Sequence, residues 1–396
     1  MNVPADEAGT VTGMNSEDKQ AWPDLAGRAL GGSVIFANDE LFAERENLIK
    51  PEEPVFRPHT FGHKGQIMDG WETRRRREPG SDAAIVRLGC GGVVRRVVVD
   101  TSYFTGNYPP EVSVEACGAE GYPSPADLAG AGWTTLVPRS PVAGDARNEF
   151  EVEPGQRATH VRLTMFPDGG VARLRVYGEP VPDPRLLPAT IDLAALENGA
   201  VVTGCSNMFY SSPANLLLPG QARVMGDGWE TSRRRDQAND WVEVRLACAG
   251  SVEVVELDTS HFVGNAPGWA MLSGDGGDLL PRTALQPDTR HRFAVPGGPE
   301  TGQVRLDIYP DGGMARLRVL GRPTAAAREA LADRFLRLLP GPQLAGLLRA
   351  AGLPAAEANR QAGADQRAGA DRQAGARAGL GVLDGLPPEV RALFRL

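Results

Sequence analysis

The segment Asp69–Arg77, "DGWETRRRR", gathers acidic, aromatic and cationic side chains that could bind an anionic substrate. A guanidinium group is planar and forms paired hydrogen bonds with a carboxylate, so Arg74, Arg75 or Arg76 could hold such an anion. The structural alternative is that the tryptophan fills the core while the glutamate and the arginines form an internal ion-pair network. The residues of this segment leave both hypotheses open.

A second segment, "DTSYFTGN" from Asp100 to Asn107, follows an apolar run, so we expect it where a strand passes into a loop. Asp100 could serve there as a general acid or base, or it could cap the loop through an Asx turn. His59 and His63 are four residues apart, but the nearby proline and glycine disfavour the helix that a zinc site of this spacing needs. No metal site is predicted.

Both segments occur twice in the chain. "DGWETSRRR" begins at Asp227 and "DTSHFVGN" at Asp258, each 158 residues after its first copy. A third pair, "FPDGGVARLRVYG" and "YPDGGMARLRVLG", follows in the same order. Self-similarity over this length indicates a tandem duplication of a whole domain rather than a short-period solenoid.

From the duplication we predict an N-terminal extension, a first repeat, a second repeat and a C-terminal tail, with the bounds 1–28, 29–182, 183–322 and 323–396. In the tail, "AAAREALADRFLRLL" and "QLAGLLRAAGL" have apolar residues at helical spacing. The segment "RQAGADQRAGADRQAGARAG", which begins at Arg360, has no apolar face and predicts a flexible linker. We expect a short helix after it.

Within each repeat, apolar and polar residues alternate, as in "THVRLTMF", "QVRLDIY", "WVEVRLA", "VVRRVVVD" and "ARLRVYG". A period of two with many valines is typical of half-buried strands. Asp-Gly-Gly and Gly-Asn sequences between these segments indicate turns. The expected fold is therefore all-β, with each repeat an antiparallel β-sandwich or jelly roll.

Charge and composition narrow the function classes. The net charge of −8 argues against binding of the whole protein to a nucleic-acid backbone, which needs an extensive basic surface. No apolar run is long enough for a membrane helix, and the four cysteines have no CxxC spacing. We therefore expect a soluble, cytoplasmic protein that binds neither nucleic acid nor membrane.

The motifs quoted above resemble those of the allantoicase family, the allantoate amidinohydrolases of ureide breakdown. The resemblance extends from about Gly31 to Arg322 and includes "NDELFAERENLIKPEEPVF", "FGHKGQIMDGWETRRRR" and "LDTSHFVGNAPG". It implies two jelly-roll domains of the galactose-binding-like type. It also implies hydrolysis of allantoate to (S)-ureidoglycolate and urea.

On this resemblance, Glu72 or Asp100 would handle protons, an arginine would hold the substrate carboxylate and Asn107 would bind a ureido group. The remaining side chains of the expected substrate site are Asp69, Trp71, Thr73, Arg74, Arg75 and Arg76. Their counterparts in the second copy are Glu230, Arg233, Arg234, Asp258, His261 and Asn265. Because Arg74 aligns with Ser232, the first copy has the fuller polar set and is the preferred active domain. No cofactor is predicted, a divalent metal stays open, and a homo-oligomer is expected.

Two other function classes compete with the enzyme hypothesis. The first is a non-catalytic tandem β-sandwich that binds a small ligand such as a sugar. The second is a scaffold in which the arginine run organises an oligomer. Aromatic residues make up only 6% of the chain, and the repeated loops are rich in Asp, Glu, Arg and Asn, which favours a polar, anionic substrate.

Overall fold

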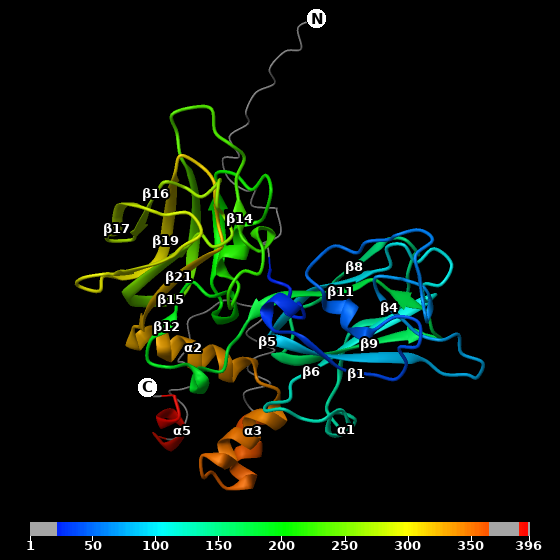
Figure 1. Ribbon diagram of the computed structural model, residues 1–396. Coiled ribbons are helices and arrows are strands. Elements are labelled where there is room, and N and C mark those ends of the chain that lie inside the picture. The colour runs from blue at the N-terminus through cyan, green and yellow to red at the C-terminus, as the bar shows by residue number, and fades with distance from the viewer. Residues whose placement is uncertain (1–21, 364–387, 395–396) are drawn as a thin grey trace, which may run out of the picture. The chain divides into compact units, whose positions relative to one another are not determined.

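The computed structural model describes residues 22–363 and 388–394. It divides into two compact units (Figure 1). One unit contains the first repeat, Trp22–Leu187, together with the tail from Arg328 onward, and the other contains the second repeat, Pro188–Ala327. Residues 22–28 thus belong with the first repeat, whereas most of the expected N-terminal extension lies outside the described residues.

The first repeat is built from antiparallel strands, as the alternating pattern predicts. Its strands are β1 (Ser33–Ala37), β2 (Phe61–Gly62), β3 (Gly65–Gln66), β4 (Trp71–Glu72), β5 (Asp82–Asp100), β6 (Glu111–Cys117), β7 (Thr134–Pro141), β8 (Arg147–Glu151), β9 (Ala158–Phe166), β10 (Gly170–Val171) and β11 (Arg173–Pro180). A one-turn helix, α1 (Pro125–Leu128), precedes β7.

The second repeat has the same order of main strands but no counterparts of β2, β3 and α1. Its strands are β12 (Ile191–Asp192), β13 (Val201–Cys205), β14 (Trp229–Glu230), β15 (Asp240–Asp258), β16 (Trp269–Gly274), β17 (Gly277–Ala284), β18 (Arg290–Ala294), β19 (Glu300–Tyr309), β20 (Gly313–Met314) and β21 (Arg316–Pro323). The predicted duplication of an all-β domain is confirmed.

One long strand in each repeat belongs to both layers of the sandwich. The first part of β5 pairs with β1 and β9, and its second part pairs with β11 and β8. The change of partner falls in the register shift between Arg87 and Gly92. Glycine is required there, since a Cβ on Gly89 would lie 2.3 Å from the carbonyl oxygen of Leu30. The strand β15 changes partners in the same way.

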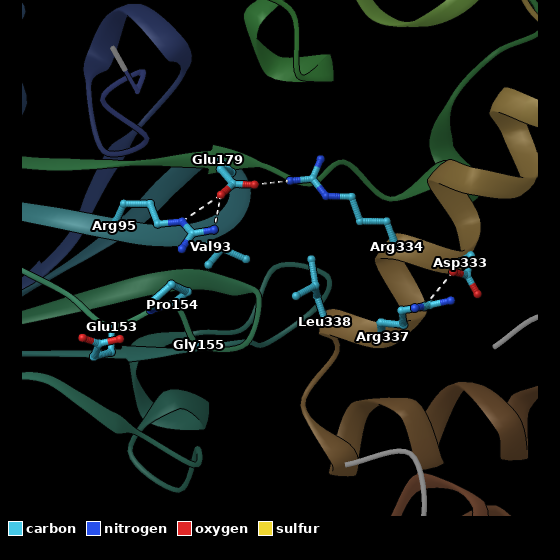
Figure 2. Close-up of a pocket in the computed structure, with 10 residues that line it drawn as sticks. All are labelled: Val93, Arg95, Glu153, Pro154, Gly155, Glu179, Asp333, Arg334, Arg337 and Leu338. Carbon is cyan, nitrogen blue, oxygen red and sulfur yellow. Dashed lines mark hydrogen bonds and ion pairs between the residues drawn. The ribbon is translucent and has the colours of Figure 1, made fainter. Parts of the chain in front are cut away.

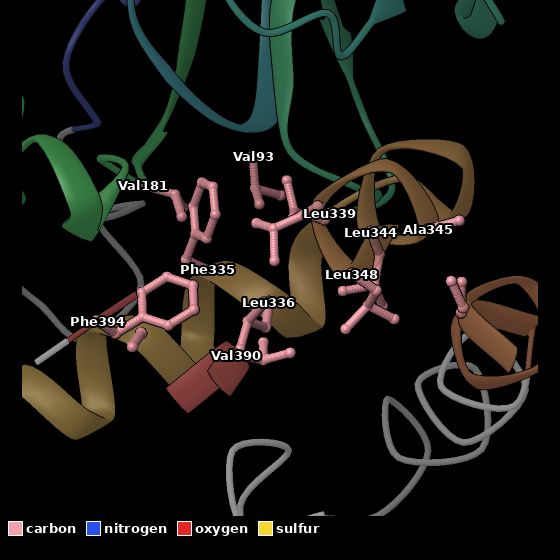
Figure 3. Packing of buried hydrophobic residues seen from close by; sticks show 14 residues of the cluster. Val93, Val181, Phe335, Leu336, Leu339, Leu344, Ala345, Leu348, Val390 and Phe394 are labelled. Carbon is pink, nitrogen blue, oxygen red and sulfur yellow. The ribbon is translucent and has the colours of Figure 1, made fainter. Parts of the chain in front are cut away.

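The tail is helical, as predicted, and packs against the first repeat from Arg328 onward (Figure 3). Its helices are α2 (Ala325–Leu338), α3 (Gly341–Ala350) and α5 (Pro388–Ala392), and residues 355–363 are also helical. The predicted linker begins at Arg360, so its first four residues end a helix instead of forming a linker. The rest of that segment lies outside the described residues.

Close packing at one glycine holds the short strands β4 and β10 beside the main sandwich. Gly170 of β10 pairs with Glu72 of β4, and a Cβ on this glycine would lie 2.0 Å from the ring of Phe104. The second repeat reproduces the contact between Gly313 and Phe262, again at 2.0 Å. In both copies a phenylalanine ring therefore occupies the space that a side chain at this glycine would need.

We expect Gly170→Ala to lower the free energy of unfolding by about 1–3 kcal/mol, because the added methyl group must displace the buried Phe104 ring. Gly106→Ala is the matched control, since no atom lies within 4 Å of the place that its added Cβ would take, and the change should stay within about 0.5 kcal/mol. Urea unfolding of both variants measures the difference. Equal stabilities would contradict the close contact between Gly170 and Phe104.

Candidate active site

Trp71 anchors the segment that carries the candidate acid, Glu72. Its side chain is fully buried, and its indole Nε1 donates a hydrogen bond to the backbone oxygen of Asp39 at 2.8 Å. The strand β4 is only two residues long and pairs with β10. Because neighbouring residues of a strand point in opposite directions, the buried tryptophan directs Glu72 away from the core.

Glu72 pairs with an amide rather than with an arginine. Asn107 Nδ2 donates a hydrogen bond to Glu72 Oε1 at 2.7 Å. In the part of the chain that the structure describes, no cationic side chain forms an ion pair with Glu72. Burial therefore raises the pKa of this carboxyl above its ordinary value of 4.5, and the hydrogen bond from Asn107 offsets only part of the increase. A carboxyl of this kind can act as a general acid near neutral pH.

Asp100 shapes the loop that brings Asn107 to this carboxyl. Its side chain is only 3% exposed, and its Oδ1 accepts a hydrogen bond from the backbone N–H of Ser102 at 2.8 Å. This is the Asx turn that the sequence offered as one of two alternatives. The backbone oxygen of Asn107 then accepts a hydrogen bond from Gly170 N at 2.7 Å, which fixes the loop beside β10.

The three candidate arginines have different surroundings. Arg74 forms an ion pair with Asp39, although 64% of its side chain is exposed. Arg76 forms an ion pair with the buried Asp82 at 2.6 Å. Arg75 is exposed, and no hydrogen bond or ion pair joins its side chain to another described residue. The ion-pair network of the structural hypothesis exists, but its acids are aspartates from other segments and not Glu72.

Asp69 and Thr73 belong to the framework around the candidate acid. Asp69 forms ion pairs with Lys50 at 3.2 Å and with the buried Arg173 at 2.7 Å. Thr73 is buried, and its backbone N–H donates to the carbonyl oxygen of Gly169 at 3.0 Å. These contacts hold the start and the middle of the Asp69–Arg77 segment, and a role of either residue in substrate binding stays a prediction.

Sequence reasoning did not identify Asp39 and Asp82 as part of this framework. Asp82 is nearly fully buried, and one of its carboxylate oxygens, Oδ2, has no hydrogen-bond partner; Asp240 of the second repeat shares both properties. A comparison of the two copies could have found these residues. Asp82 recurs as Asp240, and Asp39 aligns with Asn207.

The second repeat rebuilds most of the arrangement. Asn265 donates to Glu230 at 2.7 Å, and Trp229 donates to the backbone oxygen of Asn207 at 2.8 Å. Arg234 forms an ion pair with Asp240 at 2.7 Å. Asp258 accepts a hydrogen bond from Ser260 N at 2.8 Å, as Asp100 does from Ser102. The side chain of Arg233, like that of Arg75, is exposed.

One ion pair is replaced by a neutral pair in the second repeat. Where the first repeat has Asp39 and Arg74, the second has Asn207 and Ser232, and Asn207 Nδ2 donates to Ser232 Oγ at 2.8 Å. Both partners change together, so the contact survives without its charge. The ion pair between Arg74 and Asp39 is thus specific to the first repeat.

The loops next to the two glutamates also differ. The first repeat has the β2–β3 hairpin, which the second lacks, with His59 and His63 exposed in non-helical segments as predicted. In the second repeat Met225 Sδ lies 3.5 Å from Asn265 Nδ2, and His261 Nε2 is 3.0 Å from the backbone oxygen of Ala222.

Two negative findings concern the described residues alone. Residues 22–363 and 388–394 contain no group of three or more His, Cys, Asp or Glu side chains placed to hold a metal ion. Within those same ranges, every helix is too short or too polar to span a membrane.

Comparison with known proteins gives concordant matches. A family model described as the allantoicase repeat matches residues 23–181 and 191–324. The probable allantoicase of Nocardia farcinica is 62% identical over 310 residues, covering 76% of this chain and 94% of the relative. The probable allantoicase of Streptomyces coelicolor is 50% identical over 337 residues, covering 80% of this chain and 90% of the relative. The crystal structure of allantoicase from Saccharomyces cerevisiae matches with a TM-score of 0.68 at 36% identity. The match covers 76% of this chain and 94% of that structure.

The residues that match the family model include both copies of the Trp–Glu segment and both Asn–Glu pairs. The duplicated β-sandwich, the repeated framework and the extent of these matches agree with one another. The chain belongs to the allantoicase family.

Proposed function

We propose that this protein is a hydrolase that converts allantoate and water to (S)-ureidoglycolate and urea, with its working site in the first repeat. The names of the similar proteins support the substrate. The observation that carries the choice of acid is the half-buried Glu72, hydrogen-bonded to Asn107 without a cationic partner among the described residues. The choice of the first repeat rests on the ion pair of Arg74 with Asp39, which Ser232 and Asn207 replace in the second repeat.

The reaction needs one group that can give and take a proton. The central carbon of allantoate carries two ureido groups and a carboxylate. When one ureido group leaves as urea, its nitrogen must gain a proton, and the electron pair of the other ureido nitrogen stabilises the positive charge on the central carbon. Water then adds its oxygen to that carbon and loses a proton, which closes the balance.

Glu72 suits both proton transfers. Burial raises its pKa and so favours the protonated form, which can protonate the leaving nitrogen. The resulting carboxylate can then accept the proton of the attacking water, which restores the acid. The amide of Asn107 keeps the carboxyl oriented, and its remaining polar atoms can bind a ureido group.

Arg75 is the best candidate to hold the substrate carboxylate. Its guanidinium has no partner among the described residues, whereas Arg76 is committed to the buried Asp82 and Arg74 to Asp39. An arginine without a protein partner can offer a carboxylate two parallel N–H groups. Arg74 is largely exposed, so its positive charge can also attract the substrate carboxylate while its ion pair with Asp39 is kept.

The competing function, a non-catalytic carbohydrate-binding sandwich, has less support. The charged groups around Glu72 suit a small anion better than a neutral sugar. We further propose that the enzyme works in the cytoplasm and as a homo-oligomer. Neither proposal affects the chemistry assigned to Glu72.

Glu72→Gln should lower kcat by at least about a hundredfold, because the amide can keep the contact with Asn107 but cannot transfer the proton. Glu230→Gln is the matched control in the second repeat and should retain most of the activity. Release of urea from allantoate measures both. Asp100→Asn tests the second candidate acid in the same assay. Loss of activity in Glu230→Gln alone would place the working site in the second repeat instead.

The raised pKa of Glu72 also predicts how stability depends on pH. Below pH 4.5 the carboxyl is mostly protonated in both states, and as pH rises the unfolded chain ionises before the folded one, which destabilises the folded state. Glu72→Gln should therefore gain stability over the wild type between pH 4 and pH 7. Urea unfolding at both pH values tests this, with the exposed Glu78→Gln as control. An advantage that shrinks with rising pH would contradict the assignment.

Arg75→Gln should raise KM for allantoate about ten- to a hundredfold with a smaller change in kcat, since it removes a charged hydrogen bond that both substrate and transition state use. Arg233→Gln, the corresponding change in the second repeat, should leave KM unchanged. Steady-state kinetics on allantoate compare the two variants. An unaltered KM in Arg75→Gln would transfer the role to another arginine.

A further inference from the structure

The C-terminal tail is docked on the first repeat by a hydrophobic cluster. Phe335 and Leu336 of α2 are buried together with Val93 and Val181 of the repeat, and residues of α3 and α5 complete the cluster (Figure 3). Polar contacts reinforce the docking through one buried arginine. The backbone N–H of Arg157 donates to the oxygen of Leu338 at 2.7 Å, and its guanidinium lies 5.1 Å from the Phe335 ring centre.

Docking of the tail leaves a cavity of about 770 Å³ between α2 and the repeat. This volume is typical of small-molecule sites. Figure 2 shows the residues of the repeat and of α2 facing one another across it. The lining residues are Val93, Arg95, Glu153, Pro154, Gly155, Glu179, Asp333, Arg334, Arg337 and Leu338.

The cavity lies well away from Glu72. The strand β11 connects the two regions, because Arg173 at its start contacts Asp69 and Glu179 near its end lines the cavity. Six residues of a strand span about 20 Å. The cavity is thus a separate site within the first-repeat unit.

The cavity has a region of excess positive charge, to which the repeat contributes Arg95 and α2 contributes Arg334 and Arg337. Glu179 accepts hydrogen bonds from Arg95 Nε at 2.7 Å and from Arg334 Nη2 at 2.8 Å, so a single carboxylate lies between two guanidinium groups. Each guanidinium has five N–H donors, and Glu179 takes two from Arg95 and one from Arg334. Arg337 adds a third guanidinium and forms an ion pair with Asp333 of its own helix. The donors that remain can bind an anion.

The repeat side of the cavity, which also carries Arg95, has an acid without a partner among the described residues. Glu153 is exposed, and within the described residues no ion pair or hydrogen bond to its side chain occurs. Val93, Pro154 and Leu338 provide the apolar surface of the cavity. A ligand that matches these groups has a carboxylate for the arginines and N–H donors for Glu153.

We propose that this cavity binds a small ureido carboxylate as a second ligand site, distinct from the site of Glu72. The carboxylate follows from the arginines of the cavity, and the N–H donors follow from Glu153. The choice of a ureido group rests on the proposed function, because that reaction consumes one ureido acid and releases another. Since the ligand contacts both α2 and the repeat, its binding stabilises the docked tail. Arg334 and Arg337 lie beyond residue 324, where the match to the family model ends.

Isothermal titration of the full chain with N-carbamoylglycine, a ureido carboxylate, tests the proposal. Arg334→Gln combined with Arg337→Gln should weaken binding at least tenfold, while both residues remain good helix formers. Arg349→Gln, on α3 and outside the cavity lining, is the matched control and should bind as the wild type does. Unfolding temperatures without the probe verify that the variants retain their fold.

A second variant tests the role of Glu153 and leaves the tail unchanged. Glu153→Gln should weaken binding of N-carbamoylglycine at least fivefold, whereas acetate, which has no N–H donors, should bind both proteins equally weakly. The proposal is overturned if the double arginine variant binds N-carbamoylglycine as tightly as the wild type. It is also overturned if acetate binds as tightly as N-carbamoylglycine.

The same protein samples separate this proposal from the proposed function. Allantoate turnover is measured independently on the wild type, and its absence would overturn the enzymatic proposal. The difference in N-carbamoylglycine binding between the wild type and the arginine variants would still report on the cavity. Conversely, normal turnover with no loss of binding in the arginine variants would overturn the second site alone.

Discussion

The candidate site depends on the hydrogen bond from the buried indole of Trp71 to the backbone oxygen of Asp39. This bond satisfies the one polar atom of a large apolar side chain and therefore fixes the position of the ring. With the ring fixed, the next residue must point away from the core. Trp229 and Asn207 repeat the same bond at the same length, so both copies hold a glutamate in this way.

Partner chemistry then separates the carboxylates of the site into two kinds. Asp39 and Asp82 form ion pairs with guanidinium groups, and hydrogen bonds from Leu41 and Arg74 lower the pKa of Asp39 despite its partial burial. Glu72 faces only an amide and is partly removed from water, which stabilises its neutral form. Carboxyl groups with such different environments are the usual basis for acid–base chemistry, and the separation here arises from loop contacts rather than from the strands.

The duplication provides an internal comparison that one domain could not. The Glu–Asn pair, the buried tryptophan and the Arg–Asp pair with the orphaned oxygen persist, so the framework does not need the charge at position 74. The exchange of Asp39 and Arg74 for Asn207 and Ser232 keeps a hydrogen bond while it removes two charges. Such a paired change is expected where leaving one charge unpaired near the interior is costly.

The sequence by itself determined the duplication, the antiparallel all-β fold, the helices of the tail and the resemblance to a family, because period and local composition record which side of an element is buried. It also identified Glu72 and Asn107 as candidates, but not as partners. Only the tertiary structure decided that these residues, 35 positions apart, share a hydrogen bond, that β5 serves both layers, and that the tail packs on the first repeat although it follows the second. Such contacts depend on how loops close over long separations, and no local pattern in the chain encodes that closure.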